Sequence, residues 1–512
     1  MTVQRLESDV VVVGAGPAGL MLAAELRLGG ADVVVLDRRE GPTTQSRAST
    51  LHARTMEIFD GRGLLRALGT PPCETRGHFG GLPLDLTLPG AHPGQWKVPQ
   101  MRTEELLGDW AGALGARVRR LHEVRAVRAG ALGVEVVAAG PGGPVRVRAR
   151  YLVACDGQDS TVRRLLGADF PGQDAERELL RADVAGLDIP DRRFERLPGG
   201  LAIAARRPDG VTRVMVHAFG VPAPARTGEP GFAEVCQVWQ RVTGEDISTG
   251  TPLWVNAFGD ACRQVARYRQ GRVLYAGDAA HQQMPIGGQA LNLGLQDAVN
   301  LGWKLAAVAR GTAPDTLLDS YHDERHPVGR RVLDNIRTQA RLLLGGAEAA
   351  SLRALMEELL QQEDVRRHLA GMISGVDVRH AMGPGEHPLL GARLPHARLA
   401  VGHEVRSSAQ LLRAGRGVLL TLGPAAAALH EEAAAWPERV VCVAARCADG
   451  VQGALHGVDA LLVRPDGHVA WVRPGSTASL REALTCWFGA PRPVPGAADD
   501  RSPALSPAVF GE

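Results

Sequence analysis

Glycines and carboxylates follow short apolar runs at three places in the chain, and these residue types bind phosphate and hydroxyl groups. The first place is Gly14-x-Gly16-x-x-Gly19, directly after the run "SDVVVV". In such a pattern Gly14 permits a tight turn, Gly16 lets a pyrophosphate approach the backbone at a helix N-terminus, and Gly19 allows close helix–strand packing. The pattern therefore predicts a dinucleotide-binding turn, with Pro17 and Ala18 at the start of the helix.

An acidic residue follows at the distance that this kind of turn requires. Asp37 ends the second apolar run, "DVVVLDRR", 23 residues after Gly14, and would bind ribose hydroxyls. The neighbouring Arg38 and Arg39 either contact adenosine or an NADPH phosphate, or face solvent. The alternative for the whole segment is a glycine turn in an ordinary βαβ unit, with Asp37 as a solvated strand end. The fingerprint alone does not distinguish FAD from NAD.

The second place is "CDGQDSTVRRLLG", which has Asp156-Gly157 at the end of a predicted strand. Ser160 and Thr161 then predict a cap for a helix over 161–166. Taken alone, this segment is ordinary turn chemistry.

The third place, "GDAAHQQMPIGGQALN" (277–292), has a carboxylate after a strand and then a glycine turn before a helix. Gly277 and Asp278 follow the run "GRVLYA", and Gly287 and Gly288 lead into the helical pattern. A dinucleotide that carries a flavin is long. One helix N-terminus serves its pyrophosphate, and a second serves the isoalloxazine ring. The combination therefore favours FAD over NAD.

Charge predicts the role of each group at the flavin end. Reduced flavin is negative around N1 and the C2 carbonyl, where a helix N-terminus supplies free N–H groups and a positive dipole. Gly287 and Gly288 let the backbone pass close to a flat ring. Leu291 and Asn292 are predicted to start the helix and to offer those N–H groups. Asp278 is predicted to accept hydrogen bonds from the ribityl hydroxyls.

The motifs lie where strand, turn and helix follow one another, which predicts a parallel sheet as the core. Residues 173–265 contain alternating segments, with a helix-like stretch near 231–243, and predict a mostly antiparallel second domain. A long helical stretch covers roughly 315–372. Beyond a Pro/Gly-rich linker, a β-α-β-β-β-α order over 417–488 resembles part of a thioredoxin fold without its redox-active dithiol.

The predicted fold class is α/β: a Rossmann-like FAD-binding domain with an inserted, mostly antiparallel β substrate domain, plus a C-terminal thioredoxin-like domain. A chain of 512 residues is too long for one core, which agrees with two or three domains. The predicted boundaries are 1–76, 101–172 and 266–385 for the FAD-binding domain, 77–100 and 173–265 for the substrate domain, and 393–512 for the redox-inactive C-terminal domain.

Composition argues against several classes of function. The 58 basic and 56 acidic residues give a net charge of +2, so there is no polyelectrolyte signature for nucleic acid or an anionic membrane. Seven scattered cysteines without a C-x-x-C pair argue against a disulfide framework or a metal site and fit a reducing cytoplasm. A strand is predicted within nine residues of the N-terminus, which leaves no room for a signal peptide. No apolar run approaches the ~20 residues of a transmembrane helix.

Four segments together resemble the para-hydroxybenzoate hydroxylase-type (class A) FAD-dependent aromatic monooxygenases. They are "GAGPAG" at 14–19, "SRASTLHARTMEIFDGRGL" at 46–64, "CDGQDSTVR" at 155–163 and "GRVLYAGDAAHQQMPIGGQALNLGLQDAVNLGWKLA" at 271–306. The resemblance covers essentially the full chain. It is strongest to the branch that oxidises aromatic polyketides in antibiotic pathways.

The resemblance implies a site. Carried over position by position, the residues expected at FAD are Gly14, Gly16, Pro17, Ala18, Gly19, Asp37, Arg38, Arg47, Gln100, Asp156, Gly277, Asp278, Pro285, Gly287, Gly288, Ala290, Leu291 and Asn292. Asp156 is also expected to serve NADPH. Two positions depart from the family, because Asp37 stands where Glu is usual and Ala290 where Gly is usual beside the flavin.

The resemblance also implies a reaction. NADPH reduces FAD, reduced flavin reacts with O₂ to give a C4a-hydroperoxide, and the distal oxygen passes to a phenolic carbon of a polycyclic polyketide of the angucycline, anthracycline or tetracycline kind. Only one dinucleotide fingerprint is present, which fits transient docking of NADPH on the flavin domain. A monomer or homodimer is expected. Three alternatives stay open: Baeyer–Villiger or ring-opening oxygen insertion, a flavin-dependent reductase or dehydrogenase, and a non-enzymatic flavin-binding scaffold.

No residue stands out as a general base. His281, beside the flavin loop, is expected to be a structural histidine that bonds a backbone group. His217 and Arg213, on the middle sheet, are expected to be solvated rather than to bind a ligand. Core packing is expected for the three apolar residues that would suit a pocket, Met215, Phe219 and Trp254.

Overall fold

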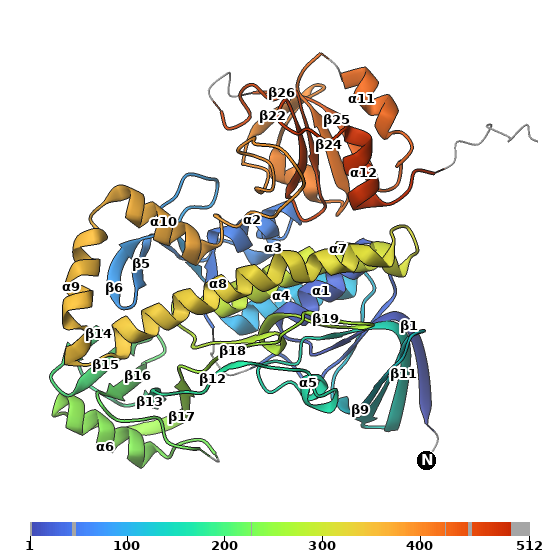
Figure 1. The fold of residues 1–512 in the computed structure, drawn as a ribbon. Helices are drawn as coiled ribbons and strands as arrows, with labels where there is room; N and C mark the ends of the chain where they lie inside the picture. Colours follow the sequence, from blue (N-terminus) through green and yellow to red (C-terminus); the bar gives the residue numbers. More distant parts are fainter. Residues whose placement is uncertain (1–2, 44–47, 227, 425, 449–452, 493–512) are drawn as a thin grey trace, which may run out of the picture.

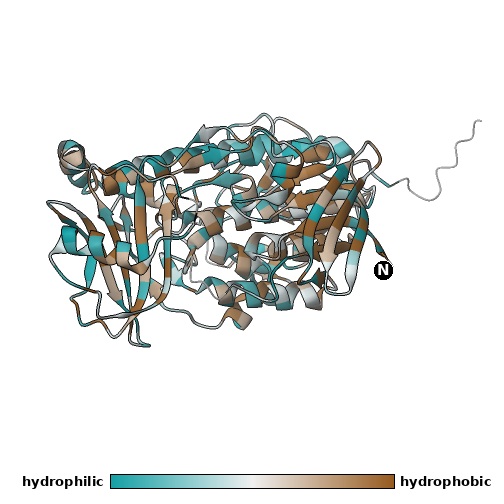
Figure 2. Cartoon of the chain, turned by 90° about the horizontal axis from the view of Figure 1, so that it is seen from below, coloured by the Kyte–Doolittle hydropathy of each residue, from teal (hydrophilic) through white to brown (hydrophobic). Residues whose placement is uncertain are grey.

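Two long helices run across the molecule and divide it (Figure 1). The computed structural model describes residues 3–43, 48–226, 228–424, 426–448 and 453–492. Helices α7 (Gln289–Ala309) and α8 (Asp319–Leu344) lie between the C-terminal domain on one side and the two larger sheets on the other. Figure 2 shows these sheets at opposite ends of the molecule, with the N-terminus beside one of them.

The sheet beside the N-terminus has eight strands and a parallel centre. Its path is β19 (Arg269–Gln270), β20 (Val273–Tyr275), β11 (Gly143–Ala154), β1 (Gln4–Val13), β2 (Val33–Leu36) and β8 (Arg117–Arg119), with the hairpin β10 (Val134–Gly140) and β9 (Glu123–Ala129) continuing from β11. Strand β1 pairs in parallel with β2 and β11, and β11 pairs in parallel with β20. Valine-rich runs suit strands that are buried on both faces. The carboxyl ends of all four strands therefore meet at one edge, where α/β proteins bind ligands.

Helix α1 (Pro17–Leu28) follows β1 and packs closely along α7. The close approach depends on small residues. A Cβ added at Gly302 of α7 would lie 2.4 Å from the Cβ of Glu25, and one added at Gly29 would lie 2.5 Å from the Cβ of Ala306. The packing fixes the start of α7 relative to the first glycine turn.

The predicted antiparallel second domain is a five-stranded sheet. In spatial order its strands are β14 (Arg192–Leu197), β15 (Gly200–Arg206), β16 (Val211–Ala218), β13 (Glu178–Ala185) and β17 (Thr251–Gly259). Helix α6 (Phe232–Thr243), close to its predicted bounds, covers one face, where its Trp239 packs in one cluster with Val214 and Val216. The opposite face, which carries Met215, packs toward α8 and the 284–286 loop.

The predicted single helical stretch over 315–372 is wrong. The segment divides into a 3-10 turn η2 (Asp315–Leu318), α8, a second 3-10 turn η3 (Ala347–Ala349), α9 (Ala350–Leu359) and α10 (Glu363–Ser374). Helix α8 ends at Gly345, whose backbone turns to an extended conformation (ψ 145°), and Gly346 follows. Two adjacent glycines have low helix propensity, which explains the break. Among the described residues, no helix combines the length and the apolar character that crossing a bilayer requires.

Residues 77–100, predicted to join the antiparallel domain, add no strand to its sheet. Strands β5 (Arg76–Phe79) and β6 (Leu82–Asp85) pair with each other, whereas β7 (Gln95–Lys97) pairs with β3 (Thr50–His52) and β4 (Cys73–Glu74). Phe79, Leu82 and Leu84 pack with residues of α8 and α10. The domain boundaries stay a prediction.

The C-terminal domain has the element order expected from the sequence. Its main sheet runs β25 (Val440–Ala444), β24 (Gly417–Thr421), β27 (Ala460–Val463) and β28 (Val469–Arg473), with α11 (Ala426–Ala433) and α12 (Leu480–Phe488). Strands β24 and β25 are parallel, and the other neighbours are antiparallel. The relationship to thioredoxin stays a prediction.

Buried charges join this domain to the long helices. Arg464 donates to both carboxylate oxygens of Glu324 on α8, at 2.7 and 2.8 Å, and Lys304 of α7 lies 3.0 Å from the same carboxylate. Arg62 pairs with Glu25 at 2.6 Å and also donates to a main-chain carbonyl of the C-terminal domain. Removing one partner of such a buried pair costs about 3–5 kcal/mol, so the interface is specific.

Candidate active site

The first glycine turn is shaped by backbone contacts. A Cβ added at Gly14, whose φ is +104°, would lie 2.3 Å from the carbonyl oxygen of Cys155, and one at Gly19 would lie 1.9 Å from the oxygen of Gly14. At Gly16 the nearest atom would be the Arg39 guanidinium, 3.9 Å away. Packing therefore requires glycine at positions 14 and 19. Gly16 instead faces the open space that a pyrophosphate needs.

Asp37 lies at the carboxyl end of β2 and is almost completely buried. One carboxylate oxygen accepts a hydrogen bond from the N–H of Ala15 at 2.6 Å, and the other accepts from the N–H of Arg39 at 2.8 Å. Asp37 therefore also holds the glycine turn against β2, a role that the sequence did not predict. Arg38, which was predicted either to contact a ligand or to face solvent, is exposed.

Two further residues, Arg47 and Gln100, were predicted to contact FAD. Gln100 is the first residue of α4 (Gln100–Ala113), and its amide donates to Glu104 at 2.8 Å while its N–H donates to the carbonyl of Ala48. Arg47 lies outside the described residues.

Asp156 follows β11 and closes a local network. Its carboxylate accepts from the Ser160 hydroxyl at 2.6 Å and from the N–H of Val162 at 3.1 Å. Burial raises the pKa of Asp156, although both hydrogen bonds oppose that shift. Ser160 caps helix α5 (Thr161–Leu165) by accepting from the N–H of Arg163, which confirms the predicted cap.

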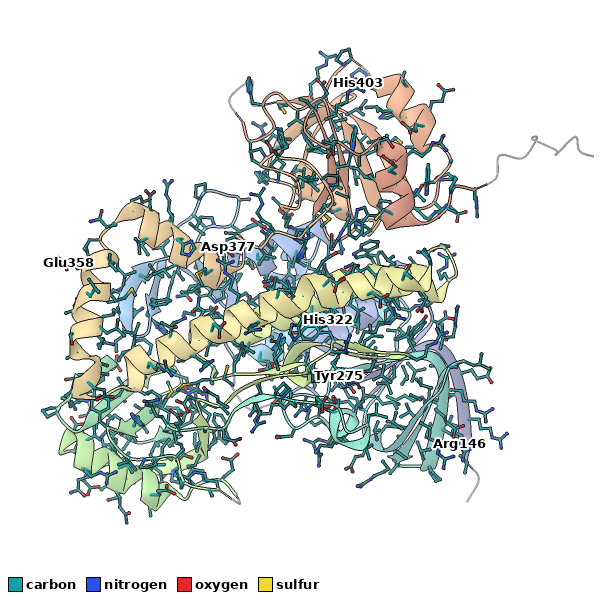
Figure 3. The ribbon with its side chains drawn as sticks, viewed as in Figure 1. Arg146, Tyr275, His322, Glu358, Asp377 and His403 are labelled. Carbon is teal, nitrogen blue, oxygen red and sulfur yellow. The ribbon has the colours of Figure 1, made fainter. Side chains whose placement is uncertain are left out.

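Gly277 and Asp278 form a 3-10 turn, η1 (Gly277–Ala279), after β20, whose last residue Tyr275 is labelled in Figure 3. A Cβ added at Gly277 would lie 3.1 Å from the Cβ of Ala18 and 3.7 Å from the Cα of Gly294. The structure therefore brings the first and third motifs into contact, through the start of α1 and the second turn of α7. The Asp278 side chain is exposed at this junction.

Helix α7 begins at Gln289, so the prediction that Leu291 and Asn292 start it is wrong. Gly288 adopts the left-handed conformation (φ +69°), which ends the turn two residues earlier than the apolar pattern indicated. The N–H groups of the first helical turn are those of Gln289, Ala290 and Leu291. The cap residue Gly288 has no side chain to bond these groups, and no described side chain caps the helix, so they are available to a ligand.

Asn292 acts through its side chain instead. Its amide nitrogen donates to the carbonyls of Gly288 at 2.7 Å and Thr50 at 3.0 Å. Its amide oxygen accepts from the N–H of His52 at 2.9 Å and from the Thr55 hydroxyl at 2.6 Å. One buried amide therefore ties the start of α7 to β3 and to helix α2 (Ala53–Gly61).

His52 is a site residue that the sequence did not single out. It is fully buried, and its Nε2 lies 2.7 Å from the carbonyl oxygen of Gly287. Burial lowers the pKa of His52 to about 4, so the ring is neutral near pH 7 and Nε2–H donates to Gly287. The stretch "TLHART" within the family resemblance was the available signal.

His281 bonds a carboxylate rather than the expected backbone group. Its Nε2 lies 2.9 Å from Asp297 of α7, which also accepts from Arg325 at 2.8 Å and from the N–H of Gly277 at 3.2 Å. Burial raises the pKa of Asp297, but Arg325 and His281 outweigh burial and lower it. An ionised Asp297 thus fixes the turn that carries Asp278.

The prediction that His217 and Arg213 are solvated is wrong. His217 is 2% exposed, and its two ring nitrogens lie 2.8 Å from the carbonyl of Glu178 and 3.1 Å from that of Leu344 at the end of α8. Arg213 forms a two-point ion pair with Asp183 at 2.7 and 2.8 Å. Both side chains hold structure rather than face solvent alone.

The apolar residues predicted as core packing have a more specific location. Met215 and Phe219 pack with Met284 and Ile286 in a cluster between the antiparallel sheet and the loop before α7. Trp254, on β17, stacks against the Arg181 guanidinium at 4.3 Å. The apolar face of the sheet therefore adjoins the turn at Gly287.

These residues fit FAD. The Gly16 position has space for a pyrophosphate, and among the described residues neither α1 nor α7 has a side-chain cap at its N-terminus. Pro285 is exposed on the loop before α7, and Gly287 and Gly288 both have left-handed backbones that a ring can approach.

Comparison with known families places the chain. A family model described as "FAD binding domain" matches residues 7–336, and one described as "Aromatic-ring hydroxylase, C-terminal" matches residues 387–491. The chain belongs to the FAD-dependent aromatic-ring hydroxylases. It is therefore an FAD-dependent monooxygenase, and the α/β fold class predicted from the sequence is confirmed.

Individual relatives match almost end to end. The chain is 45% identical over 508 residues to 12-dehydrotetracycline 5-monooxygenase/anhydrotetracycline 6-monooxygenase of Streptomyces rimosus. The match covers 94% of this chain and 99% of the relative. The chain is 42% identical over 507 residues to rifampicin monooxygenase of Streptomyces venezuelae, with the same coverage. The crystal structure of CabE, an aromatic hydroxylase from angucycline biosynthesis, matches with a TM-score of 0.92 and 51% identity, over 95% of this chain and 100% of that one.

Proposed function

We propose that this protein hydroxylates a polycyclic aromatic polyketide of the angucycline, anthracycline or tetracycline kind in antibiotic biosynthesis, with NADPH and O₂ as co-substrates. The observation that carries the proposal is the apolar cluster of Met215, Phe219, Met284 and Ile286, which lies between the antiparallel sheet and the turn before α7. Met215 and Phe219 are only half-buried in this cluster, so a large, flat, apolar substrate would bind against these two side chains. Relatives named for tetracycline and angucycline oxidation support this class.

When bound, FAD supplies the redox chemistry: once reduced by NADPH, it activates O₂ for transfer of one oxygen atom to an electron-rich aromatic carbon. The protein's own tasks are to bind, to orient and to exclude water.

At the flavin end, the first-turn N–H groups of Gln289, Ala290 and Leu291 would donate to the pyrimidine edge and stabilise its negative charge. Asn292 and His52 would hold this turn in place, since both bond to the Gly287-Gly288 backbone. The neutral His52 donates a proton in a hydrogen bond without placing a second charge beside the ring.

At the other end, the remaining predicted contacts would bind the dinucleotide. Gly16 admits the pyrophosphate to the start of α1, Asp278 lies at the junction of α1 and α7 for the ribityl chain, and Asp156 lies at the end of the neighbouring strand β11. Asp37, shorter than the usual Glu, would accept from ribose while keeping its bond to Ala15.

We also propose a cytoplasmic location, because the scattered cysteines of the sequence fit a reducing compartment. We propose a monomer or homodimer as the oligomeric state. Baeyer–Villiger insertion remains the second candidate, because the same apolar face and the same flavin turn would serve it. Hydroxylation ranks first because structurally similar relatives carry that name.

The test is NADPH oxidation by the purified yellow protein against a panel of polycyclic aromatic polyketides under ¹⁸O₂. The expected product gains one labelled oxygen, which NMR locates on an aromatic carbon. Label in a ring lactone would instead assign Baeyer–Villiger insertion. NADPH oxidation with product reduction and no label would make the protein a reductase and overturn the proposal.

A further inference from the structure

Strand register places a buried arginine beside Met215 on the five-stranded sheet, where β16, β13 and β17 are neighbours (Figure 1). Arg181 of β13 is paired across the strands with Met215 of β16 on one side and with Asn256 of β17 on the other. Directly paired residues point to the same face of a sheet, so all three side chains share the face that meets the 284–286 loop. The face on which the substrate is proposed to bind therefore contains a cation.

Two aromatic rings and one amide hold the Arg181 side chain. Its Nε donates to the Oδ1 atom of Asn256 at 2.9 Å. The guanidinium carbon lies 4.3 Å from the ring centroid of Trp254 and 5.2 Å from that of Phe258. Phe258 packs with the apolar cluster beside the 284–286 loop, so the cation adjoins the proposed substrate face.

Positive charge exceeds negative charge at this part of the sheet. Asp183, on the same strand and face as Arg181, accepts from Arg213 at 2.7 and 2.8 Å. It also accepts from Arg207 at 3.2 Å, and Arg207 lies 3.4 Å from exposed Asp209. Burial raises the pKa of Asp183, but the three arginines outweigh burial and lower it, so this carboxylate is ionised. Within the described part of this cluster, three guanidinium groups accompany two carboxylates.

A cation between aromatic rings favours a ligand oxygen that carries negative charge. A guanidinium has five N–H donors, and the bond to Asn256 uses one of them. Hydrogen bonds to ionised oxygen atoms are shorter and roughly twice as strong as neutral ones, and apolar surroundings strengthen them further. Phenols and enols conjugated to a ring carbonyl lose a proton readily, so a polycyclic aromatic compound of this kind offers such an oxygen.

We propose that Arg181 and Asn256 form a subsite for an ionised phenol or enol oxygen of the substrate, which selects acidic hydroxyquinone-like compounds over their neutral analogues. The inference rests on the proposed function and narrows its substrate class. The substrate rings lie against the half-buried Met215 and Trp254, while Arg181 donates to the oxygen. The bond from Arg181 to Oδ1 orients the Asn256 amide, whose NH₂ group supplies a second donor.

Equilibrium binding of two probes to the FAD-loaded protein tests the subsite in the absence of NADPH. The probes are emodin, a polycyclic phenol, and physcion, in which a methyl ether replaces the most acidic hydroxyl of emodin. Equilibrium dialysis gives both dissociation constants. The variants are Arg181→Gln, Arg181→Lys and Asn256→Leu, and the matched control is Arg206→Gln, at an exposed position of the same sheet. FAD content and the urea midpoint report on folding.

We expect the wild type to bind emodin about tenfold more tightly than physcion, as one charge-assisted hydrogen bond predicts. Arg181→Gln should bind the two probes equally, whereas Arg181→Lys, which keeps the charge, should retain most of the preference. Asn256→Leu should retain only part of it, and the control should match the wild type. Lowering the pH until emodin is protonated should remove the preference of the wild type.

The proposal is wrong if the wild type binds both probes equally or binds neither. It is also wrong if Arg181→Gln keeps the preference, or if it loses affinity for both probes to the same extent, which is the result of a purely structural role. Should Arg181→Gln not fold, an unchanged preference in Asn256→Leu would overturn it. The labelled-oxygen assay tests the proposed function separately, since a protein without this preference can still incorporate the label.

Discussion

Helices α1 and α7 both begin at a glycine turn, but different parts of the chain hold the two turns. The turn before α1 is shaped chiefly by main-chain packing, because Gly14 and Gly19 approach main-chain atoms of Cys155 and of Gly14, and one side chain, Asp37, bonds to its Ala15 N–H. The turn before α7 is held by side chains, chiefly Asn292 and His52.

The two ends of the cofactor site therefore differ in how they tolerate substitutions. A backbone-defined turn depends on the absence of a Cβ, so any substitution at its packed glycines moves main-chain atoms. A turn held by side chains can keep its backbone while its position and polarity are adjusted. We expect substitutions at the pyrophosphate end to cause misfolding. Substitutions at the flavin end should weaken stability and FAD binding gradually.

The largest expected effect is that of Gly14→Ala. A Cβ 2.3 Å from the oxygen of Cys155, at a φ of +104°, should destabilise the protein by about 3–5 kcal/mol and prevent FAD binding. The matched control is Gly16→Ala, whose Cβ meets nothing closer than 3.9 Å. It should unfold at the wild-type urea midpoint yet bind FAD more weakly. Equal stability losses in the two variants would contradict the comparison.

The next effect is that of Asn292→Leu. It removes four hydrogen bonds and leaves buried partners on Thr50 and His52 unsatisfied, which should cost about 2–4 kcal/mol. Asn292→Asp keeps the acceptor but turns its second oxygen toward the carbonyls of Gly288 and Thr50, so it should also lose stability. Urea unfolding and flavin release on dilution measure the two consequences. A variant as stable as wild type would show that the turn before α7 needs no side-chain support.

The third effect concerns pH. Folding lowers the pKa of His52 from 6.5 to about 4, so the unfolded chain binds the extra proton first. The stability that neutral His52 contributes is complete above about pH 6.5 and is lost as the pH falls toward 4. His52→Gln, which keeps a donor for Gly287, should therefore lose less stability than wild type over this pH range. The measurement is the free energy of unfolding as a function of pH. Parallel curves for wild type and His52→Gln would contradict this prediction.

The smallest effect is that of Ala290→Gly, which restores the residue usual in the family. Glycine within the first turn of α7 should cost about 0.5–1 kcal/mol of helix stability. The flavin absorbance and FAD affinity should change little, because the N–H of this residue is kept. A large spectral shift would mean that the Ala290 methyl contacts the ring.

The sequence predicted these two ends unequally, and for a physical reason. A G-x-G-x-x-G turn after a valine-rich strand is a local device, so Gly14, Gly16, Gly19 and the strand-ending Asp37 could be placed from spacing alone. Asp37's second bond, to Ala15, was missed because it depends on the side-chain conformation.

The flavin end depends on contacts between residues that are far apart in the chain. His52 and Gly287 are separated by 235 positions, and no periodic pattern joins them. The start of α7 was misplaced by two residues because apolar spacing indicated Leu291, whereas the left-handed Gly288 decides it. The break after α8 was missed for a similar reason, since a glycine pair has little effect on the average of a long apolar pattern.

A crystal structure of the protein with FAD bound tests directly whether the start of α7 binds the flavin. We expect the C2 carbonyl oxygen of the isoalloxazine to accept a hydrogen bond of about 2.7–3.2 Å from a first-turn N–H of α7, that of Gln289, Ala290 or Leu291. In that structure His52 still donates to Gly287. An isoalloxazine bound elsewhere, with these N–H groups bonded only to water, would contradict it.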